Sequence, residues 1–263
     1  MDFKEKTILI TGASTGIGKA LAIELSKINC NLILIARRIE LLEELKEQLS
    51  ENKAKIIVFK CDVSNKLEVE NTCAKISAQY DFIDIAILNS GFGVRVVPEK
   101  FNSEHAEQTF GANIFGIIYW VEQLLPKYLD KNKGMIVGVS SLADVRGYSG
   151  SGFYCASKAA ASKYLEGLAV ELKSYGIDVL TVRPGFVKTP MTDKNEFPMP
   201  FLMSPEKAAK IIASGIAKKK RYIQFPWQIV WLTRIVDLIP NALYEYMAKK
   251  DYEKKRRVEN AHK

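Results

Sequence analysis

Residues 7–18, TILITGASTGIG, pass from a short β-rich run into a turn with glycines at positions 12, 16 and 18. Glycines in such a turn let the backbone bend tightly and come close to a pyrophosphate at the N-terminus of the following helix. The spacing is G-x-x-x-G-x-G, which differs from the usual G-x-G-x-x-G. The strand-like run before the turn and the amphipathic segment 18–28 after it favour a dinucleotide-binding turn over one that is merely tight.

Short apolar runs alternate with helical segments along the rest of the chain. Near-continuous apolar strands separated by helices predict a mainly parallel sheet with helices on both faces, and ligands bind beyond the carboxyl ends of its strands. We therefore expect a Rossmann-type, doubly wound α/β fold with a seven-stranded sheet. The predicted strands are 7–11, 31–37, 55–63, 83–91, 134–141, 177–185 and 221–226, and the predicted helices are 18–28, 39–51, 66–80, 103–129, 153–175 and 204–220.

The chain shows no repeat, low-complexity tract or linker that would divide this fold. We expect one domain over residues 1–226, which includes a loop at 190–203, and a C-terminal helical extension with a basic tail over 227–263. The composition, 48% hydrophobic and 26% charged over 263 residues, is that of a soluble globular protein.

The net charge of +8 could favour binding to nucleic acid, to an anionic membrane surface or to an anionic ligand. Basic residues cluster at 218–221 and again within 249–257, where a solvated helix face and tail are the favoured interpretation. Apart from Tyr252, the clusters lack interleaved aromatic residues, which argues against nucleic-acid binding. The start, MDFKEK, has no apolar signal region, and no 18-residue apolar run predicts a membrane-spanning helix. These features predict a cytoplasmic protein.

Cysteine and histidine usage indicates no metal site. The four cysteines are scattered without a C-x-x-C pair, which fits free thiols in a reducing compartment better than disulfides or zinc ligands. Only two histidines occur, which argues against a histidine triad or a His-rich metal site.

Residues 153–162, FYCASKAAAS, place Tyr154 and Lys158 four positions apart, on one face of a predicted helix. The reference pKa of tyrosine is about 10, and a nearby cation lowers it by favouring the phenolate. The pair could therefore exchange protons with a substrate near neutral pH. The same spacing also occurs on ordinary helix surfaces, so the pair alone does not decide between the two.

Seven short motifs follow one another along the chain: TGASTGIG at 11–18, CDV at 61–63, NSG at 89–91, GANIFG around Asn113, VGVSS ending at Ser141, YCASK at 154–158 and RPGFVKT at 183–189. Each motif is weak by itself, but their order along the chain is highly specific. In these motifs the chain resembles, over residues 5–225, the short-chain dehydrogenases/reductases in their form of roughly 250 residues. Ser141 precedes Tyr154 by thirteen residues, the usual separation in that family.

The resemblance implies four catalytic residues. Tyr154 would be the general acid/base, and Ser141 would hold the substrate oxygen. Lys158 would bind the nicotinamide ribose and, with the cofactor ring, lower the pKa of the tyrosine. Asn113 would help to position a proton-relay water. Donors at the substrate oxygen suit the negative charge that hydride transfer develops there.

The resemblance also implies a cofactor-binding set spread over six segments. Asp62 and Val63 would contact the adenine, and Val187 and Thr189 would hold the carboxamide end. The full set is Gly12, Ser14, Thr15, Gly16, Ile17, Gly18, Arg37, Arg38, Asp62, Val63, Asn89, Gly91, Tyr154, Lys158, Pro184, Gly185, Val187 and Thr189.

The residues after the second strand indicate which cofactor binds. An acidic residue there would accept bonds from the adenosine ribose, but this chain has Ala36 followed by Arg37 and Arg38. An arginine fork suits a phosphate dianion, so we predict NADP(H) rather than NAD(H). Of the two arginines, Arg38 is the one expected to face solvent. The chain departs from the family pattern at Leu88, where altered strand packing is expected, and at Thr15, which gives Arg37 more weight.

The loop at 190–203 carries three methionines, two phenylalanines and three prolines. It could be an adaptable apolar lid or an ordinary loop packed on the core. A lid would favour a hydrophobic or bulky carbonyl substrate.

In the segment 225–247, tryptophans and aliphatic residues form a wide apolar stripe on a predicted helix, opposite Thr233, Arg234 and Asp237. The stripe could contact a membrane, cover the substrate pocket or form a subunit interface.

Together these features predict an NADP(H)-dependent oxidoreductase that transfers hydride between nicotinamide and a ketone or aldehyde and its alcohol, with reduction as the expected direction in cells. Two alternatives stay open: a membrane-associated reductase of lipid or sterol-like carbonyls, and a non-catalytic cofactor-sensing or scaffolding protein. The resemblance further implies a homodimer or homotetramer assembled through 103–129 and 153–175.

Overall fold

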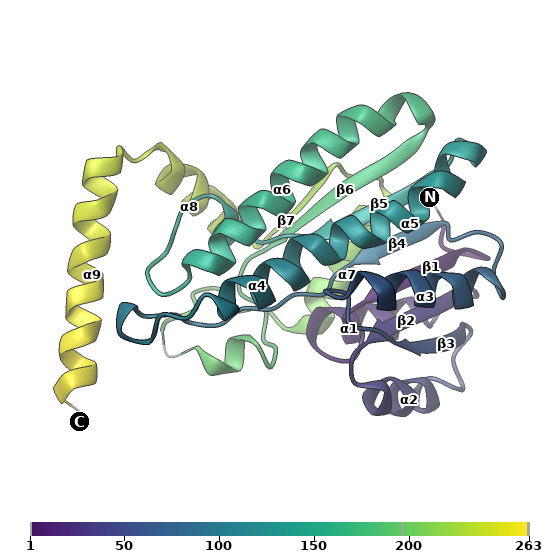
Figure 1. Cartoon of the computed structure of the whole chain (residues 1–263), viewed down its shortest axis with the longest axis horizontal. Helices are drawn as coiled ribbons and strands as arrows, with labels where there is room; N and C mark the ends of the chain where they lie inside the picture. Colours follow the sequence, from purple (N-terminus) through teal and green to yellow (C-terminus); the bar gives the residue numbers. More distant parts are fainter. Residues whose placement is uncertain (1, 196, 262–263) are drawn as a thin grey trace.

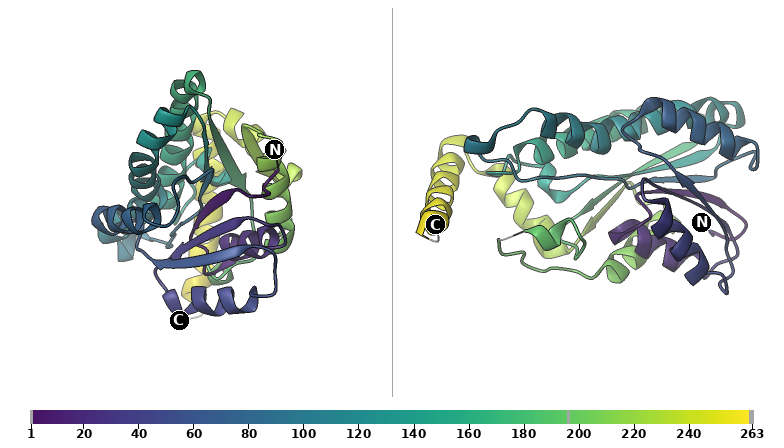
Figure 2. Two further views of the ribbon diagram at one scale, coloured as in Figure 1. Left: turned by 90° about the vertical axis from the view of Figure 1, so that its right-hand side faces the viewer. Right: turned by 60° about the horizontal axis from the view of Figure 1, so that its bottom comes forward.

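The computed structural model describes residues 2–195 and 197–261. Seven strands form one sheet in the order β3-β2-β1-β4-β5-β6-β7, and every neighbouring pair is parallel. Helices cover both faces of the sheet, which gives the three layers seen in Figure 2. The Rossmann-type doubly wound fold expected from the sequence is confirmed, with a sheet that is fully parallel.

The strands and helices follow the predicted alternation. The strands are β1 Thr7–Thr11, β2 Asn31–Ala36, β3 Lys55–Lys60, β4 Ile85–Leu88, β5 Gly134–Val139, β6 Ile177–Pro184 and β7 Tyr222–Phe225. The helices are α1 Gly16–Leu25, α2 Ile39–Gln48, α3 Lys66–Ser77, α4 Glu104–Phe110, α5 Gly116–Lys131, α6 Gly152–Leu172, α7 Pro205–Ala217, α8 Trp227–Leu238 and α9 Asn241–Ala261.

Successive side chains of each strand enter two separate cores. In β1, Ile8 and Ile10 pack with α1, α2 and α7, whereas Leu9 packs with α3, α5 and α6. This alternation follows from the two-residue period of a strand, and it explains why the central strands are apolar at almost every position. The central strands therefore present mainly apolar side chains to both cores.

Strand β1 lies between β2 and β4, with Ile8 opposite Leu32 on one side and Ile85 on the other. The chain adds strands in one direction from β1 to β3 and in the other from β4 to β7. Such a reversal leaves a crevice beyond the carboxyl ends of β1 and β4, where ligands bind in open α/β sheets.

Two predicted helices are interrupted. The segment 103–129 contains a π-helical stretch, Gly111–Phe115, between α4 and α5. The segment 225–247 forms two helices instead of one, because Pro240 has no N–H to continue α8 and restricts Ile239 to an extended backbone, with ψ 128°. Figure 1 shows α9 standing apart from the α/β body at the end of α8.

Gly138 of β5 offers a test of how tightly the sheet and α6 pack. A Cβ there would lie 2.2 Å from Leu165 Cδ1 on α6. We expect Gly138→Ala to lower the free energy of unfolding by about 1–3 kcal/mol through overpacking, measured by urea denaturation. Gly167→Ala is the matched control, since Gly167 lies on α6 with nothing within 4 Å of the added Cβ. It should be neutral or stabilise the protein by up to about 1 kcal/mol. Equal stabilities for both variants would contradict this packing.

Candidate active site

The glycine-rich turn after β1 forms a cradle, a backbone hollow that side chains in place of its glycines would fill. Gly12 and Gly16 adopt positive φ of 66° and 57°, and a Cβ on Gly18 would lie 2.3 Å from the Gly12 carbonyl oxygen. Ser14, Thr15 and Ile17 complete the turn, and no side chain caps the first N–H groups of α1. The turn and helix end therefore fit a pyrophosphate, because free N–H groups and the helix dipole both favour an anion there.

Asn89, which follows β4, holds this turn through hydrogen bonds. Its side-chain amide donates to the carbonyl oxygens of Thr11 at 3.0 Å and Gly12 at 3.4 Å. The Thr11 hydroxyl in turn accepts from the backbone N–H groups of Asn89 at 2.9 Å and Ser90 at 3.1 Å. Asn89 thus holds the predicted cofactor turn through the protein's own backbone.

Arg37 extends from the end of β2 toward the segment after β3. Its guanidinium is 3.7 Å from an Asp62 carboxylate oxygen, and its side chain is 69% exposed. The other Asp62 oxygen accepts from the backbone N–H of Ser64 at 3.0 Å and from its hydroxyl at 2.7 Å. Arg38 is exposed as the N-cap of α2, and Val63 is buried in the core.

Tyr154 and Lys158 lie one turn apart on α6, as their spacing predicts. The Lys158 ammonium is 5.8 Å from the centroid of the Tyr154 ring and donates to the Val139 carbonyl oxygen at 2.9 Å. Only 3% of Lys158 is exposed. Burial lowers the pKa of Lys158 to about 8, and the Asp144 carboxylate opposes that shift.

Ser141 follows β5 and hydrogen-bonds the Tyr154 phenol, while its Oγ accepts from the Ala143 N–H at 3.1 Å. Burial raises the pKa of Tyr154, and the Ser141 hydrogen bond lowers it. The net direction for the chain without cofactor is upward, because desolvation is the largest cause at Tyr154. The lowering expected from Lys158 together with the cofactor ring stays a prediction.

Asn113 lies inside the π-helical stretch and is fully buried. Its Oδ1 accepts from the Phe92 N–H at 2.8 Å, and its Nδ2 donates to the Phe92 carbonyl at 2.9 Å and to Ser157 Oγ at 2.9 Å. The side chain therefore ties the loop after β4 to α6. A Cβ on Gly91 in that loop would lie 3.5 Å from the Lys158 ammonium, which places Gly91 beside the catalytic pair.

The segment after β6 returns to the glycine-rich turn. A Cβ on Gly16 would lie 2.9 Å from Thr189 Cγ2, and Val187 is buried where it pairs with Met203. Pro184 ends β6, and the Gly185 N–H donates to the Phe225 carbonyl at 2.7 Å. The predicted residues at both ends of the cofactor site are thus brought to one edge of the sheet.

Met191, Phe201 and Leu202 are exposed in the loop at 190–203, and Phe186 meets Phe197 with ring centroids 6.1 Å apart. The added Cβ on Gly91 would also be 3.9 Å from Met191 Cε, so Met191 borders the catalytic pair. One end of the loop therefore contacts the site, as an apolar lid requires.

A buried ionic network that the sequence analysis missed supports these residues. Asp144, 3% exposed, is paired with Arg183, whose Nε donates to its Oδ2 at 2.7 Å. Ser162 donates to the same carboxylate at 2.5 Å, and Ser140 Oγ donates to the Lys158 carbonyl at 2.8 Å. Asp144 and Arg183 are 39 residues apart, so no local pattern signals their contact.

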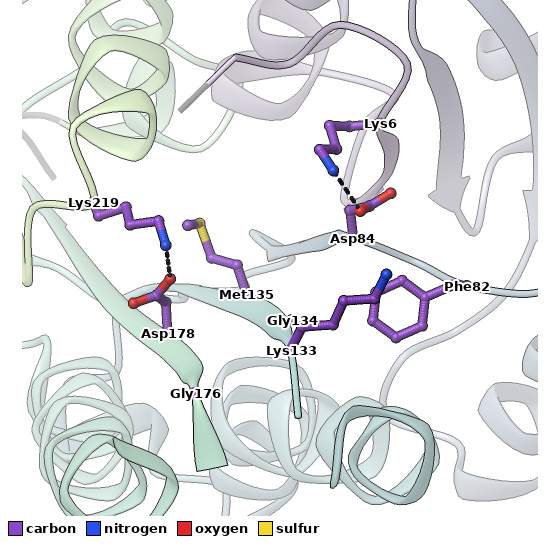
Figure 3. A pocket seen from close by; sticks show the side chains of 9 residues that line it. All are labelled: Lys6, Phe82, Asp84, Lys133, Gly134, Met135, Gly176, Asp178 and Lys219. Atoms are coloured by element: carbon purple, nitrogen blue, oxygen red, sulfur yellow. Dashed lines mark hydrogen bonds and ion pairs between the residues drawn. The ribbon is translucent and has the colours of Figure 1, made fainter. Parts of the chain in front are cut away.

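A separate pocket of about 150 Å³ lies at the amino ends of β4, β5 and β6, at the opposite edge of the sheet from Tyr154. Figure 3 shows two ion pairs in it, Lys6 with Asp84 at 3.0 Å and Lys219 with Asp178 at 2.8 Å. Its lysines are already paired or, for Lys133, placed over the Phe82 ring, so it does not offer an anion site.

Cys30, Cys61, Cys73 and Cys155 are free, buried thiols. Among the side chains that the structure describes, no group of three or more His, Cys, Asp or Glu could hold a metal ion.

Lys158 gives a pH-dependent test of the site. Its pKa is about 8 in the folded chain against 10.5 ordinarily. Below pH 8 both folded and unfolded states are charged, and folding carries the full cost of burying the ammonium. As the pH rises from 8 to 10.5, only the unfolded state still binds the proton, so that cost disappears.

We therefore expect the stability of Lys158→Met relative to wild type to fall by about 2–3 kcal/mol between pH 7.5 and pH 10, measured by urea unfolding of the cofactor-free protein. The matched control is Lys163→Met, which removes a lysine with an 81% exposed side chain from the same helix. A pH-independent difference for Lys158→Met would show that the ammonium is not desolvated.

Comparison with known proteins agrees with this geometry. The sequence model described as short chain dehydrogenase matches residues 6–198. An uncharacterized oxidoreductase of Myxococcus xanthus is 31% identical over 245 residues, covering 93% of this chain and 97% of that protein. A fatty acyl-CoA reductase of Acinetobacter baylyi is 31% identical over 223 residues, covering 84% and 76%. A short chain dehydrogenase/reductase from Burkholderia phymatum in complex with NAD has a TM-score of 0.82 at 23% identity, covering 89% of this chain and 93% of that one. The chain belongs to the short-chain dehydrogenase family of oxidoreductases.

Proposed function

We propose that this protein is an NADP(H)-dependent reductase of hydrophobic ketones or aldehydes, with Tyr154 as the general acid. The observation that carries the proposal is the cluster of Ser141, Tyr154 and Lys158 beside the glycine-rich cradle, at the carboxyl edge of the sheet. This arrangement joins a proton donor, a second hydroxyl and a buried cation at a place where a dinucleotide fits.

The cradle of Gly12, Gly16 and Gly18 would hold the cofactor, whose nicotinamide would supply the hydride. Ser141 donates a hydrogen bond to the carbonyl oxygen of the substrate, and Tyr154 delivers a proton to the same oxygen as negative charge develops there. Because burial raises the pKa of Tyr154, the phenol keeps its proton at neutral pH, as an acid in the reducing direction must. With a pKa of about 8, Lys158 is mainly cationic at pH 7 and supports the charge on the tyrosine oxygen.

The preference for NADP(H) rests on Arg37. Its guanidinium is largely exposed and is only loosely paired with Asp62, at 3.7 Å, so it is free to turn its fork toward a 2′-phosphate. Ala36 supplies no carboxylate that would repel that phosphate. The Burkholderia structure holds NAD, so the preference must be measured for this chain.

The apolar character of the substrate rests on the lid. Met191 borders Gly91 and the catalytic pair, and Phe201 and Leu202 expose further apolar surface on the same loop. The fatty acyl-CoA reductase of Acinetobacter baylyi is named for a fatty acyl-CoA substrate, which agrees with an apolar carbonyl compound.

The decisive experiment is a fluorescence titration with NADPH and NADH on wild type, Arg37→Ala and Tyr154→Phe, followed by turnover assays on a panel of carbonyl compounds. Arg37→Ala should weaken NADPH binding about 10- to 100-fold, as expected for a lost charge-assisted bond, and leave NADH binding unchanged. Arg38→Ala is the matched control and should keep the preference. Tyr154→Phe should bind NADPH normally and lose about 10²- to 10⁴-fold in turnover.

Each contrary outcome has a clear meaning. Tighter binding of NADH by wild type would overturn the cofactor assignment but would not contradict the proposed reductase activity. Failure to bind either nucleotide would favour a scaffolding protein. Binding without turnover of any carbonyl in the panel would favour a cofactor-sensing protein. Assembly into dimers or tetramers and a cytoplasmic location stay predictions, the first testable by light scattering.

A further inference from the structure

Helix α8 places its apolar side outward. Thr233, which the sequence analysis assigned to the polar face, is only 7% exposed and its hydroxyl donates to the Val230 carbonyl at 3.0 Å. Ile229 is buried beside it. Seven residues of α8 are exposed, and two of them are Arg234 and Asp237. The other five are large apolar residues, here called the α8 stripe: Trp227, Trp231, Leu232, Ile235 and Leu238.

The α8 stripe is a continuous face of one helix. Trp227, Trp231 and Ile235 are spaced by four residues, and Leu238 follows three residues later, so all four line up along the axis. Their exposed fractions are high, with 69% for Trp227, 58% for Trp231 and 83% for Leu238. Large exposed apolar patches mark interaction sites, because leaving them in water is unfavourable.

The stripe belongs to an anchored helix. Arg146 donates from Nη1 to Asn241 Oδ1 at 2.7 Å and from Nη2 to the Asp237 carbonyl at 3.0 Å, and it also bonds the Ile239 carbonyl. The Tyr244 hydroxyl donates to the Gly147 carbonyl at 2.8 Å. These bonds fix the end of α8 and the start of α9 to the loop after Ser141, so the stripe is presented in a set orientation.

Cations accompany the aromatic rings of this region. The Arg234 guanidinium lies 5.2 Å from the Trp231 ring centroid, and the Lys250 ammonium lies 4.4 Å from that of Tyr246 on α9. Lys249 is exposed next to Lys250. Of the basic cluster predicted at 249–257, the side chains beyond Glu253 lie outside the described residues. The whole chain carries a charge of +8, which attracts an anionic surface.

We infer that the α8 stripe docks on an anionic lipid surface, lying in the plane of the headgroup–acyl boundary. Tryptophans with neighbouring cations suit that boundary, where the rings enter the apolar layer and the cations reach lipid phosphates. No helix among residues 2–195 and 197–261 is long and apolar enough to span a bilayer, which fits a helix that lies on the surface. The inference goes beyond the proposed reductase activity and does not depend on it.

Flotation with vesicles and intrinsic tryptophan fluorescence test this docking. The chain has three tryptophans, and Trp120 is fully buried, so a spectral shift on adding vesicles reports on Trp227 and Trp231. We expect full-length protein to float with phosphatidylglycerol-containing vesicles and its emission to shift to the blue. Binding should fall with added salt and be much weaker to pure phosphatidylcholine vesicles.

The double variant Trp227→Ser/Trp231→Ser should bind the anionic vesicles about tenfold more weakly or worse. Val170→Ser is the matched control, since Val170 is an exposed apolar residue on α6, and it should bind as wild type does. Circular dichroism and thermal unfolding of the double variant show that the fold is kept, so that weaker binding reports on the stripe.

Three outcomes would overturn the inference. The first is that wild-type protein does not float with anionic vesicles, and the second is that the double variant floats equally well. The third is that the double substitution halves the mass found by light scattering without changing vesicle binding, which would assign the stripe to contact with a second copy of the chain.

Discussion

The hydrogen bonds between Thr11 and Asn89 join β1 to β4 at the point where the strand order reverses. A crevice can open there only if the two backbones separate without exposing unpaired polar groups. The Thr11 hydroxyl and the Asn89 amide satisfy those groups and leave the glycine-rich turn free on its outer side. The same contact sets where the loop after β4 begins, and that loop carries Gly91 to the Lys158 ammonium. The cofactor cradle and the catalytic pair are therefore positioned by one junction.

The burial of the Lys158 ammonium lowers the stability of the fold, and the same burial places a cation in the site. An ammonium that is buried loses hydration, and a single carbonyl at 2.9 Å replaces only part of it. The nearby Asp144 carboxylate compensates in part, but it is shared with Arg183 and Ser162. Gly91 leaves room beside the ammonium by having no side chain, since a Cβ there would lie 3.5 Å from Lys158 Nζ.

The periodicity of the sequence predicts most of the fold, because strands buried on both faces and amphipathic helices each have a regular pattern. The spacing of Tyr154 and Lys158 likewise predicts their shared face. Other features depend on contacts between distant segments, and no local pattern reveals them. The Asp144–Arg183 pair and the anchoring of Asn113 to Phe92 are of this kind. Burial of Tyr154, which a sequence does not state, raises its pKa in the chain without cofactor, and the lowering expected from Lys158 together with the cofactor ring stays a prediction.

The outward orientation of α8 could not be predicted from the local sequence either, since an apolar stripe alone does not say whether it faces the core or the surroundings. The break at Pro240 explains how the orientation is held. A helix that ends abruptly leaves its last carbonyl groups without partners. Arg146 supplies donors to the carbonyls of Asp237 and Ile239, and its positive charge suits the negative end of the α8 dipole. A lysine could not do this equally well, because one ammonium cannot present the planar fork that reaches several acceptors and stacks on Tyr244. Since Arg146 lies on the loop between Ser141 and Tyr154, the residue that completes α8 also attaches the extension to the backbone that carries the substrate-binding hydroxyl.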